Sequence, residues 1–200
     1  MGLIMSCFSS SESASKIKRK TLINRFPYLF NDKEKSICIV GFDFAGKTSL
    51  VYEHIACGSP DRENYVIGFV TTETVLKSTQ FLEFDISRNS NYKMIHKYLK
   101  DKAGSVAAVI LVVDSSDPEG FEDVKNYFEK FNQILENKCP ILVYLNKMDK
   151  SDAVSVEEFE AVLMLENTAE RPVHYQPSSF LKGEGIDEGL AWLEMQSKLL

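Results

Sequence analysis

Apolar runs and mixed apolar–polar stretches alternate along the 200 residues. The run that ends at Asp114 is apolar at successive positions, as expected of a strand covered by helices on both faces. The expected strands are Ser36–Val40, Phe69–Lys77, Gln80–Asp85, Ala107–Val113, Ile141–Leu145 and Val173–Gln176. The expected helices are Lys47–Cys57, Tyr92–Asp101, Gly120–Glu136, Val156–Leu165 and Ile186–Leu199.

The connections between these elements predict how the strands assemble. Only Ser78 and Thr79 join the second strand to the third, which predicts an antiparallel hairpin at one edge. Helices separate the other strands, as in a parallel sheet with helices on both faces. We therefore expect an α/β fold with a six-stranded, mostly parallel, doubly wound sheet. Ser155 and Glu158 predict a capping box at the fourth helix.

The first expected strand runs into a loop with the spacing of a phosphate-binding loop, and a helix leaves it. Glycines allow consecutive N–H groups of such a loop to point at phosphate oxygens, and the helix adds its positive dipole end. Lys47 is expected to reach the β- and γ-phosphates, and the Thr48 hydroxyl is expected to bind Mg²⁺. The residues expected around the phosphates are Gly41, Asp43, Ala45, Gly46, Lys47, Thr48 and Ser49.

A second polar motif specifies the base. Asn146-Lys147-Met148-Asp149 follows an apolar run, at the strand end where α/β sheets bind ligands. Asp149 can accept hydrogen bonds from N1–H and the exocyclic amine of guanine, and adenine lacks this pair of donors. Asn146, Lys147 and Asp149 therefore predict a site for GTP or GDP.

Three segments resemble the ADP-ribosylation factor (Arf) and Arf-like family of Ras-like small GTPases. The family pattern Gly-Leu-Asp-x-Ala-Gly-Lys-Thr is similar to residues 41–48, Ile-Gly-Phe of switch I to residues 67–69, and Glu-Gly-Leu-x-Trp-Leu of the last helix to residues 188–193. The resemblance covers residues 36–200. It implies a Ras-like P-loop G domain that binds guanine nucleotide with Mg²⁺ and recruits partners at membranes in vesicle-mediated traffic.

The resemblance also assigns roles at positions where this chain keeps or departs from the family pattern. It implies that Asp85 holds Mg²⁺ through water, whereas Val66 stands where switch I has a metal-binding threonine. Arg88 replaces the glycine whose N–H meets the γ-phosphate, and Asn89 replaces the glutamine that orients the attacking water. Phe180 stands at the guanine-facing alanine position, where only its backbone N–H is needed.

Three interpretations of these substitutions stay open. The protein could be a GTP-dependent switch with slow or partner-dependent hydrolysis, or a pseudo-GTPase scaffold that binds partners without switching. In the third interpretation, Arg88 is a built-in arginine finger that stabilises the transition state. The retained nucleotide motifs favour the first interpretation, with Asn89 and Arg88 as doubtful catalytic groups and weak intrinsic GTP hydrolysis.

The first residues predict a membrane anchor. Residues 1–6 fit the N-myristoylation pattern with Gly2 as the acceptor, and Cys7 is a palmitoylation candidate. One myristoyl chain binds a membrane only marginally, and five basic side chains against one acidic one in the first 25 residues supply a further signal. We expect a membrane-anchoring extension at 1–35 and the G domain at 36–200.

Composition favours one domain in the cytoplasm. An apolar content of 44% supplies one core, no run is long enough to span a bilayer, and no secretory signal is present. A net charge of −6 argues against nucleic-acid binding. We expect a monomer, peripheral on the cytosolic face of a Golgi, other endomembrane or plasma membrane. By resemblance, Phe69 and Phe84 lie on a surface that binds effector proteins, with core packing as the alternative.

Overall fold

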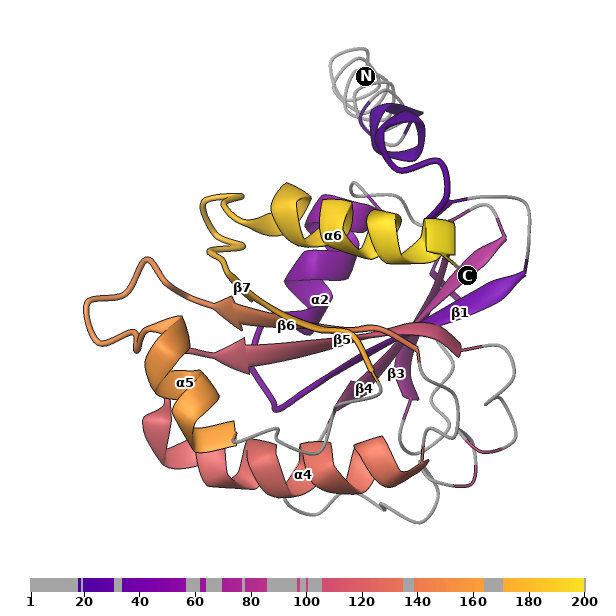
Figure 1. Ribbon diagram of the computed structural model, residues 1–200. Coiled ribbons are helices and arrows are strands. Elements are labelled where there is room, and N and C mark those ends of the chain that lie inside the picture. The colour runs from indigo at the N-terminus through magenta and orange to yellow at the C-terminus, as the bar shows by residue number, and fades with distance from the viewer. Residues whose placement is uncertain are drawn as a thin grey trace, which may run out of the picture.

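The chain folds into one central sheet with helices on both faces, as the computed structural model in Figure 1 shows: α2 and α6 cover one face, and α4 and α5 cover the other. The structure describes residues 18, 20–30, 34–56, 62–63, 70–76, 78–85, 97, 100, 106–134, 139–163 and 171–199. The expected α/β fold with a doubly wound sheet is confirmed.

The sheet has seven strands in the order β2-β3-β4-β1-β5-β6-β7. These are β1 (Lys35–Gly41), β2 (Arg62–Glu63), β3 (Val70–Leu76), β4 (Thr79–Asp85), β5 (Val106–Asp114), β6 (Ile141–Asn146) and β7 (Val173–Pro177). Strands β4, β1, β5, β6 and β7 run parallel to one another. Strand β3 runs antiparallel to both of its neighbours, β2 and β4. The expected count of six was wrong by one, because β2 is a two-residue strand, too short to show a period. Because β2 pairs with β3, the β3–β4 hairpin lies one strand in from the edge of the sheet.

The helices are α2 (Lys47–Ser49), which continues as the π-helical η1 (Leu50–Ile55), the 3-10 turn η3 (Pro118–Gly120), α4 (Phe121–Ile134), α5 (Val156–Leu163) and α6 (Ile186–Leu199). The capping box of α5 is confirmed: Ser155 N–H donates to Glu158 Oε2 at 2.9 Å, and Glu158 N–H donates to Ser155 Oγ at 3.2 Å. Of the helix expected at Tyr92–Asp101, only Lys97 and Lys100 lie within the described residues, and both are helical.

The central strand β5 separates two apolar layers. Val109 and Leu111 pack on the α4–α5 side, where the rings of Phe121 and Phe159 meet edge-on with centroids 4.8 Å apart. Ile110 points to the other side, into the core beneath α2 and α6. A strand buried on both faces explains the unbroken apolar run in the sequence.

The segment before β1 belongs to the core beneath α6. Its buried apolar side chains are Leu22, Phe26, Leu29 and Phe30. The Phe30 ring lies 6.1 Å from that of Phe81 in β4, and the Thr79 hydroxyl donates to the Leu29 carbonyl at 3.1 Å. This part of the expected N-terminal extension therefore packs on the domain.

A buried carboxyl on α6 fixes this segment. Glu194 is 6% exposed, and its two oxygens accept the backbone N–H groups of Tyr28 at 2.8 Å and Leu29 at 2.6 Å. An exposed ion pair between Arg25 and Asp187, 2.8 Å apart, lies on the same side. Exposed ion pairs contribute little to stability, so the hydrogen bonds of Glu194 hold this segment on α6 more strongly than the ion pair does.

Two cysteines of the described residues lie in the core. Cys38 and Cys139 are free and buried, and burial raises the pKa of the Cys139 thiol to about 11, so that it stays protonated and unreactive at neutral pH. Among the described helices, none is both long and apolar enough to cross a bilayer.

We predict that Glu194→Ala lowers the free energy of unfolding by about 2–3 kcal/mol, because two backbone N–H groups lose a charged acceptor. Chemical denaturation measures this change. Glu188→Ala, an exposed position on the same helix, serves as the control and is expected to cost less than about 1 kcal/mol. Equal effects of the two substitutions would contradict the role given to Glu194.

Candidate nucleotide-binding site

The glycine-rich loop connects β1 to α2 at the centre of the sheet. An added Cβ at Gly41 would lie 2.4 Å from the Val112 carbonyl oxygen, so the close approach of β1 to β5 requires glycine there. Gly46 has φ +111°, and a Cβ on it would lie 2.4 Å from the Asn146 side-chain nitrogen. The two glycines thus fix where the loop begins and where the helix starts.

The loop folds around a lysine amine. Lys47 is only 4% exposed, and its Nζ donates to the Phe42 carbonyl at 2.7 Å, across the curl of the loop. The Ala45 N–H donates to the same carbonyl at 3.2 Å. A lysine amine held inside a curl of backbone suits phosphate oxygens, as the spacing of the motif predicts.

Phe44, at the tip of the loop, has an unusual conformation. Its φ is +63°, in the left-handed region that bulky residues rarely adopt, and its side chain is 91% exposed. It lines the mouth of the pocket that also contains Asn146 and Asp149.

Asn146, the last residue of β6, joins the loop to the segment after β7. Its side-chain amide donates to the Ala45 carbonyl at 2.8 Å and accepts the Phe180 N–H at 2.9 Å. The residue is 4% exposed, so both bonds are shielded from water. Because one partner accepts and the other donates, only one orientation of the amide fits.

Lys147 forms an ion pair next to this amide. Its Nζ contacts Asp114 Oδ2, at the end of the neighbouring strand β5, at 2.5 Å. Partial burial alone would raise the pKa of Asp114, but hydrogen bonds from Lys147 and Ser116 lower it below its usual value. The Asp114 carboxyl therefore stays ionised at neutral pH and fixes the amine of Lys147, which lines the pocket.

Asp149 points its carboxylate toward the loop after β7. The Ser179 hydroxyl donates to Asp149 Oδ1 at 2.5 Å, and this bond holds the pKa of the carboxyl below its usual value. The group is ionised at neutral pH and keeps further acceptor capacity for N–H donors.

The pocket that Asn146, Lys147 and Asp149 line has a volume of about 380 Å³. Its walls come from the phosphate loop, η1, the segment after β6 and the segment after β7: Phe44, Gly46, Ser49, Glu53, Asn146, Lys147, Asp149, Lys150, Phe180 and Leu181. Its size is in the range of small-molecule sites, and the apolar rim with an ionised carboxylate fits a purine that presents N–H donors.

The donor set also fits Mg²⁺. No three His, Cys, Asp or Glu side chains cluster as a metal cage among the described residues, and Mg²⁺ usually takes one or two protein oxygens plus phosphates and water. Thr48 Oγ1 donates to Glu83 Oε2 at 3.0 Å, which brings a hydroxyl and a carboxyl together at the helix start. The register of β4 on β1 places Asp85 opposite Gly41.

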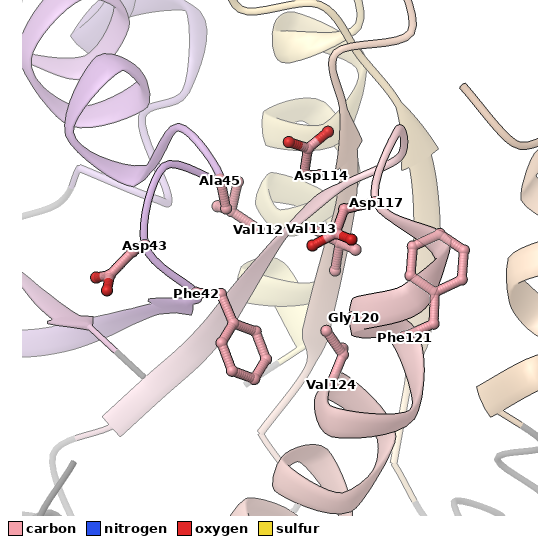
Figure 2. A pocket seen from close by; sticks show the side chains of 10 residues that line it. All are labelled: Phe42, Asp43, Ala45, Val112, Val113, Asp114, Asp117, Gly120, Phe121 and Val124. Atoms are coloured by element: carbon pink, nitrogen blue, oxygen red, sulfur yellow. The ribbon is translucent and has the colours of Figure 1, made fainter. Parts of the chain in front are cut away.

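Figure 2 shows a second, smaller pocket on the side of the loop that faces α4. Phe42 and Phe121 lie on opposite sides of it, and Asp43 and Asp114 are at its rim. Its volume is about 50 Å³, which is too small for a nucleotide.

Two aromatic predictions change. Phe84 is 0% exposed and lies in the core with Leu111, so its assignment to a partner-binding surface was wrong and the alternative of core packing holds. The Phe180 ring is also buried and meets Tyr144 edge-on at 5.3 Å, while its N–H, expected to serve guanine, already bonds Asn146.

Several predicted positions lie outside the described residues. They are Gly2, Cys7, Val66, residues 67–69 with Phe69, Arg88 and Asn89.

Three residues that hydrogen-bond to the site were not predicted from the sequence. Asp114 and Ser179 hold Lys147 and Asp149, and nothing in their local sequence marks them, because both pairings join distant strand ends. Glu83 did carry a signal: it is an acid flanked on both sides by apolar residues, Leu82 and Phe84, in a strand.

Comparisons with known protein sequences identify the family of this chain. A sequence model of the ADP-ribosylation factor family matches residues 22–197. ADP-ribosylation factor-like protein 6 of Danio rerio is 30% identical over 175 residues, or 84% of this chain and 91% of that protein. ADP-ribosylation factor-like protein 5A of Homo sapiens is 29% identical over 182 residues, which make up 89% of this chain and 98% of that protein. The chain therefore belongs to the ADP-ribosylation factor family of small GTPases, whose members in general bind guanine nucleotide and Mg²⁺.

Proposed function

We propose that this protein binds GTP and GDP with Mg²⁺ and recruits partner proteins at a membrane according to the nucleotide bound. The bridge from Asn146 to Ala45 and Phe180 carries this proposal, because it joins the phosphate loop to the pocket of Asp149. The two halves of a guanine-nucleotide site are thereby held at a fixed separation.

Each residue has a role in this proposal. Lys47 and the loop N–H groups bind the β- and γ-phosphates, and Asp149 pairs with the guanine N–H donors. Thr48 and Asp85 hold Mg²⁺, which neutralises phosphate charge when it is bound. Lys147, whose amine Asp114 fixes, lines the pocket beside Asp149 and would contact the base.

Hydrolysis is proposed to be weak. Val66, Arg88 and Asn89 stand where the family pattern has a metal-binding threonine, a glycine and a water-orienting glutamine. These same substitutions favour the second candidate function, a pseudo-GTPase scaffold, with or without nucleotide, that binds partners without switching. Nucleotide analysis of the purified protein, followed by partner binding in its GTP- and GDP-loaded forms, separates the two functions: a scaffold binds its partner equally in both forms.

The membrane location is proposed from the N-terminus. Gly2 would carry myristate, and Cys7 and the basic residues near it would add the second attachment that stable anchoring needs. This arrangement would place the protein on the cytosolic face of an endomembrane or the plasma membrane.

The first prediction from this proposed function concerns base recognition. Asp149→Asn should weaken GDP and GTP binding by roughly 100-fold or more, because two hydrogen bonds to a charged acceptor are lost, and xanthine nucleotides should gain affinity. Fluorescent-nucleotide titration measures both. Asp152→Asn, at an exposed position of the same loop, is the matched control. Equal affinity of the unmutated protein for ATP and GTP would refute the assignment.

The second prediction concerns the anchor. Gly2→Ala removes the myristate acceptor and leaves only about 1 kcal/mol of attraction per basic side chain near the surface, so the protein should move to the soluble fraction. Cys7→Ser should give an intermediate distribution. Membrane association that persists in Gly2→Ala, with no acyl chain detected on the unmutated protein by mass spectrometry, would exclude this anchor.

The third prediction concerns turnover. Single-turnover hydrolysis by the unmutated protein should not exceed about 10⁻⁴ per second, the rate of an unassisted small GTPase. Val66→Thr, Arg88→Gly and Asn89→Gln together should raise it, because the metal ligand, the close N–H approach and the water-orienting amide return. Fast hydrolysis that Arg88→Ala abolishes would establish the arginine finger instead.

A further inference from the structure

A carboxyl group is fully buried within the sheet, between β1 and β3. Glu83 in β4 is 0% exposed, and its strand neighbours Leu82 and Phe84 are also fully buried. It pairs in register with Ile39 of β1, which belongs to the core beneath α2. A buried carboxyl is costly unless it is hydrogen-bonded, so a chain that keeps one at this place needs a compensating contact.

One such contact is the hydroxyl of the phosphate-loop threonine. Thr48 Oγ1 donates to Glu83 Oε2 at 3.0 Å, from the first turn of α2 to the centre of β4. Thr48 itself is exposed, in the short helix that directly follows the phosphate loop. A buried acid thus holds the hydroxyl at the start of this helix.

The chemistry of the hydroxyl gives this contact its consequence. A threonine hydroxyl has one proton and two lone pairs. When the proton is committed to a carboxyl oxygen, the rotamer is fixed and a lone pair stays available for a cation. Groups that orient a metal ligand in this way commonly change metal affinity by about 10- to 100-fold when removed.

We propose that Glu83 is a positioning residue of the Mg²⁺ site. It accepts the Thr48 proton and directs the Thr48 oxygen toward the metal. The inference rests on the proposed binding of nucleotide and Mg²⁺. It gives Glu83 a role separate from that of Asp85, and it compensates for Val66, which has no oxygen to offer the metal.

A purely structural role for Glu83 makes a different prediction. A tie between α2 and β4 that served only folding would change the stability of the nucleotide-free protein and leave the Mg²⁺ requirement unchanged. The two roles therefore separate in a measurement that varies Mg²⁺ alone.

The test measures the Mg²⁺ concentration that gives half-maximal retention of GDP carrying a fluorescent N-methylanthraniloyl group, alongside thermal unfolding without nucleotide. Glu83→Leu should raise this concentration by about 10- to 100-fold. Glu83→Gln keeps one oxygen near Thr48 but replaces the other with an NH₂ donor, which cannot accept the Thr48 proton, so its shift should be in the same direction and smaller. Glu194→Gln alters a buried carboxyl on α6 that contacts only backbone N–H groups of residues 28 and 29 in the bonds above, and should give no shift.

The outcomes are distinct. If the unmutated protein retains the nucleotide and Glu83→Leu needs the same or less Mg²⁺, the inference is wrong although the proposed function stands. If the unmutated protein retains no guanine nucleotide at any Mg²⁺ concentration, the proposed function fails and the inference falls with it. Should Glu83→Leu not fold, the near-isosteric Glu83→Gln decides: no shift in its Mg²⁺ requirement overturns the proposal.

Discussion

The side-chain amide of Asn146 is the interaction on which the nucleotide-binding end of this fold depends. It donates to a carbonyl of the phosphate loop, Ala45, and accepts the N–H of Phe180 in the last loop, so three segments far apart in the chain meet at one buried group. Loss of the amide would leave a buried carbonyl and a buried N–H without these bonds, and such groups are costly. One neutral side chain therefore coordinates loops that have no regular structure of their own.

The glycine that starts α2 depends on the same amide. A Cβ on Gly46 would lie 2.4 Å from the Asn146 nitrogen and 3.1 Å from the Phe180 ring. The loop can approach β6 this closely only with glycine there, and the Phe180 ring fills the space below by packing on Tyr144. Placing a phenylalanine at the position where the family pattern has alanine is thus compatible with the site, because the larger side chain enters the core and leaves the pocket mouth to the backbone.

Much of this arrangement could be predicted from sequence, and the remainder could not for physical reasons. Strands such as β5 and β6 are long apolar runs with clear ends, and the two nucleotide motifs lie directly after strands, where local pattern is most informative. The two-residue strand β2 has no period to detect. The pairings of Lys147 with Asp114 and of Asp149 with Ser179 depend on which strand ends become neighbours, which is a property of the sheet order. Phe84 was misplaced because an aromatic residue in a strand fits a core and a partner surface equally well by pattern alone.

The residues proposed for nucleotide binding and those proposed to affect hydrolysis lie in different parts of the chain. The groups proposed to hold the base and phosphates follow β1, β6 and β7, which are neighbours or near neighbours at the centre and one side of the sheet. The substitutions that weaken the family's hydrolysis pattern, Val66, Arg88 and Asn89, fall instead next to β3 and after β4 in the chain. Affinity for a nucleotide can therefore be kept while hydrolysis is reduced. Glu83 lies where these two parts meet, on β4 and in contact with Thr48 of the phosphate loop. In the proposed site, Glu83 orients from within the core the metal ligand that Thr48 supplies, in a chain that has Val66 at the family's threonine position.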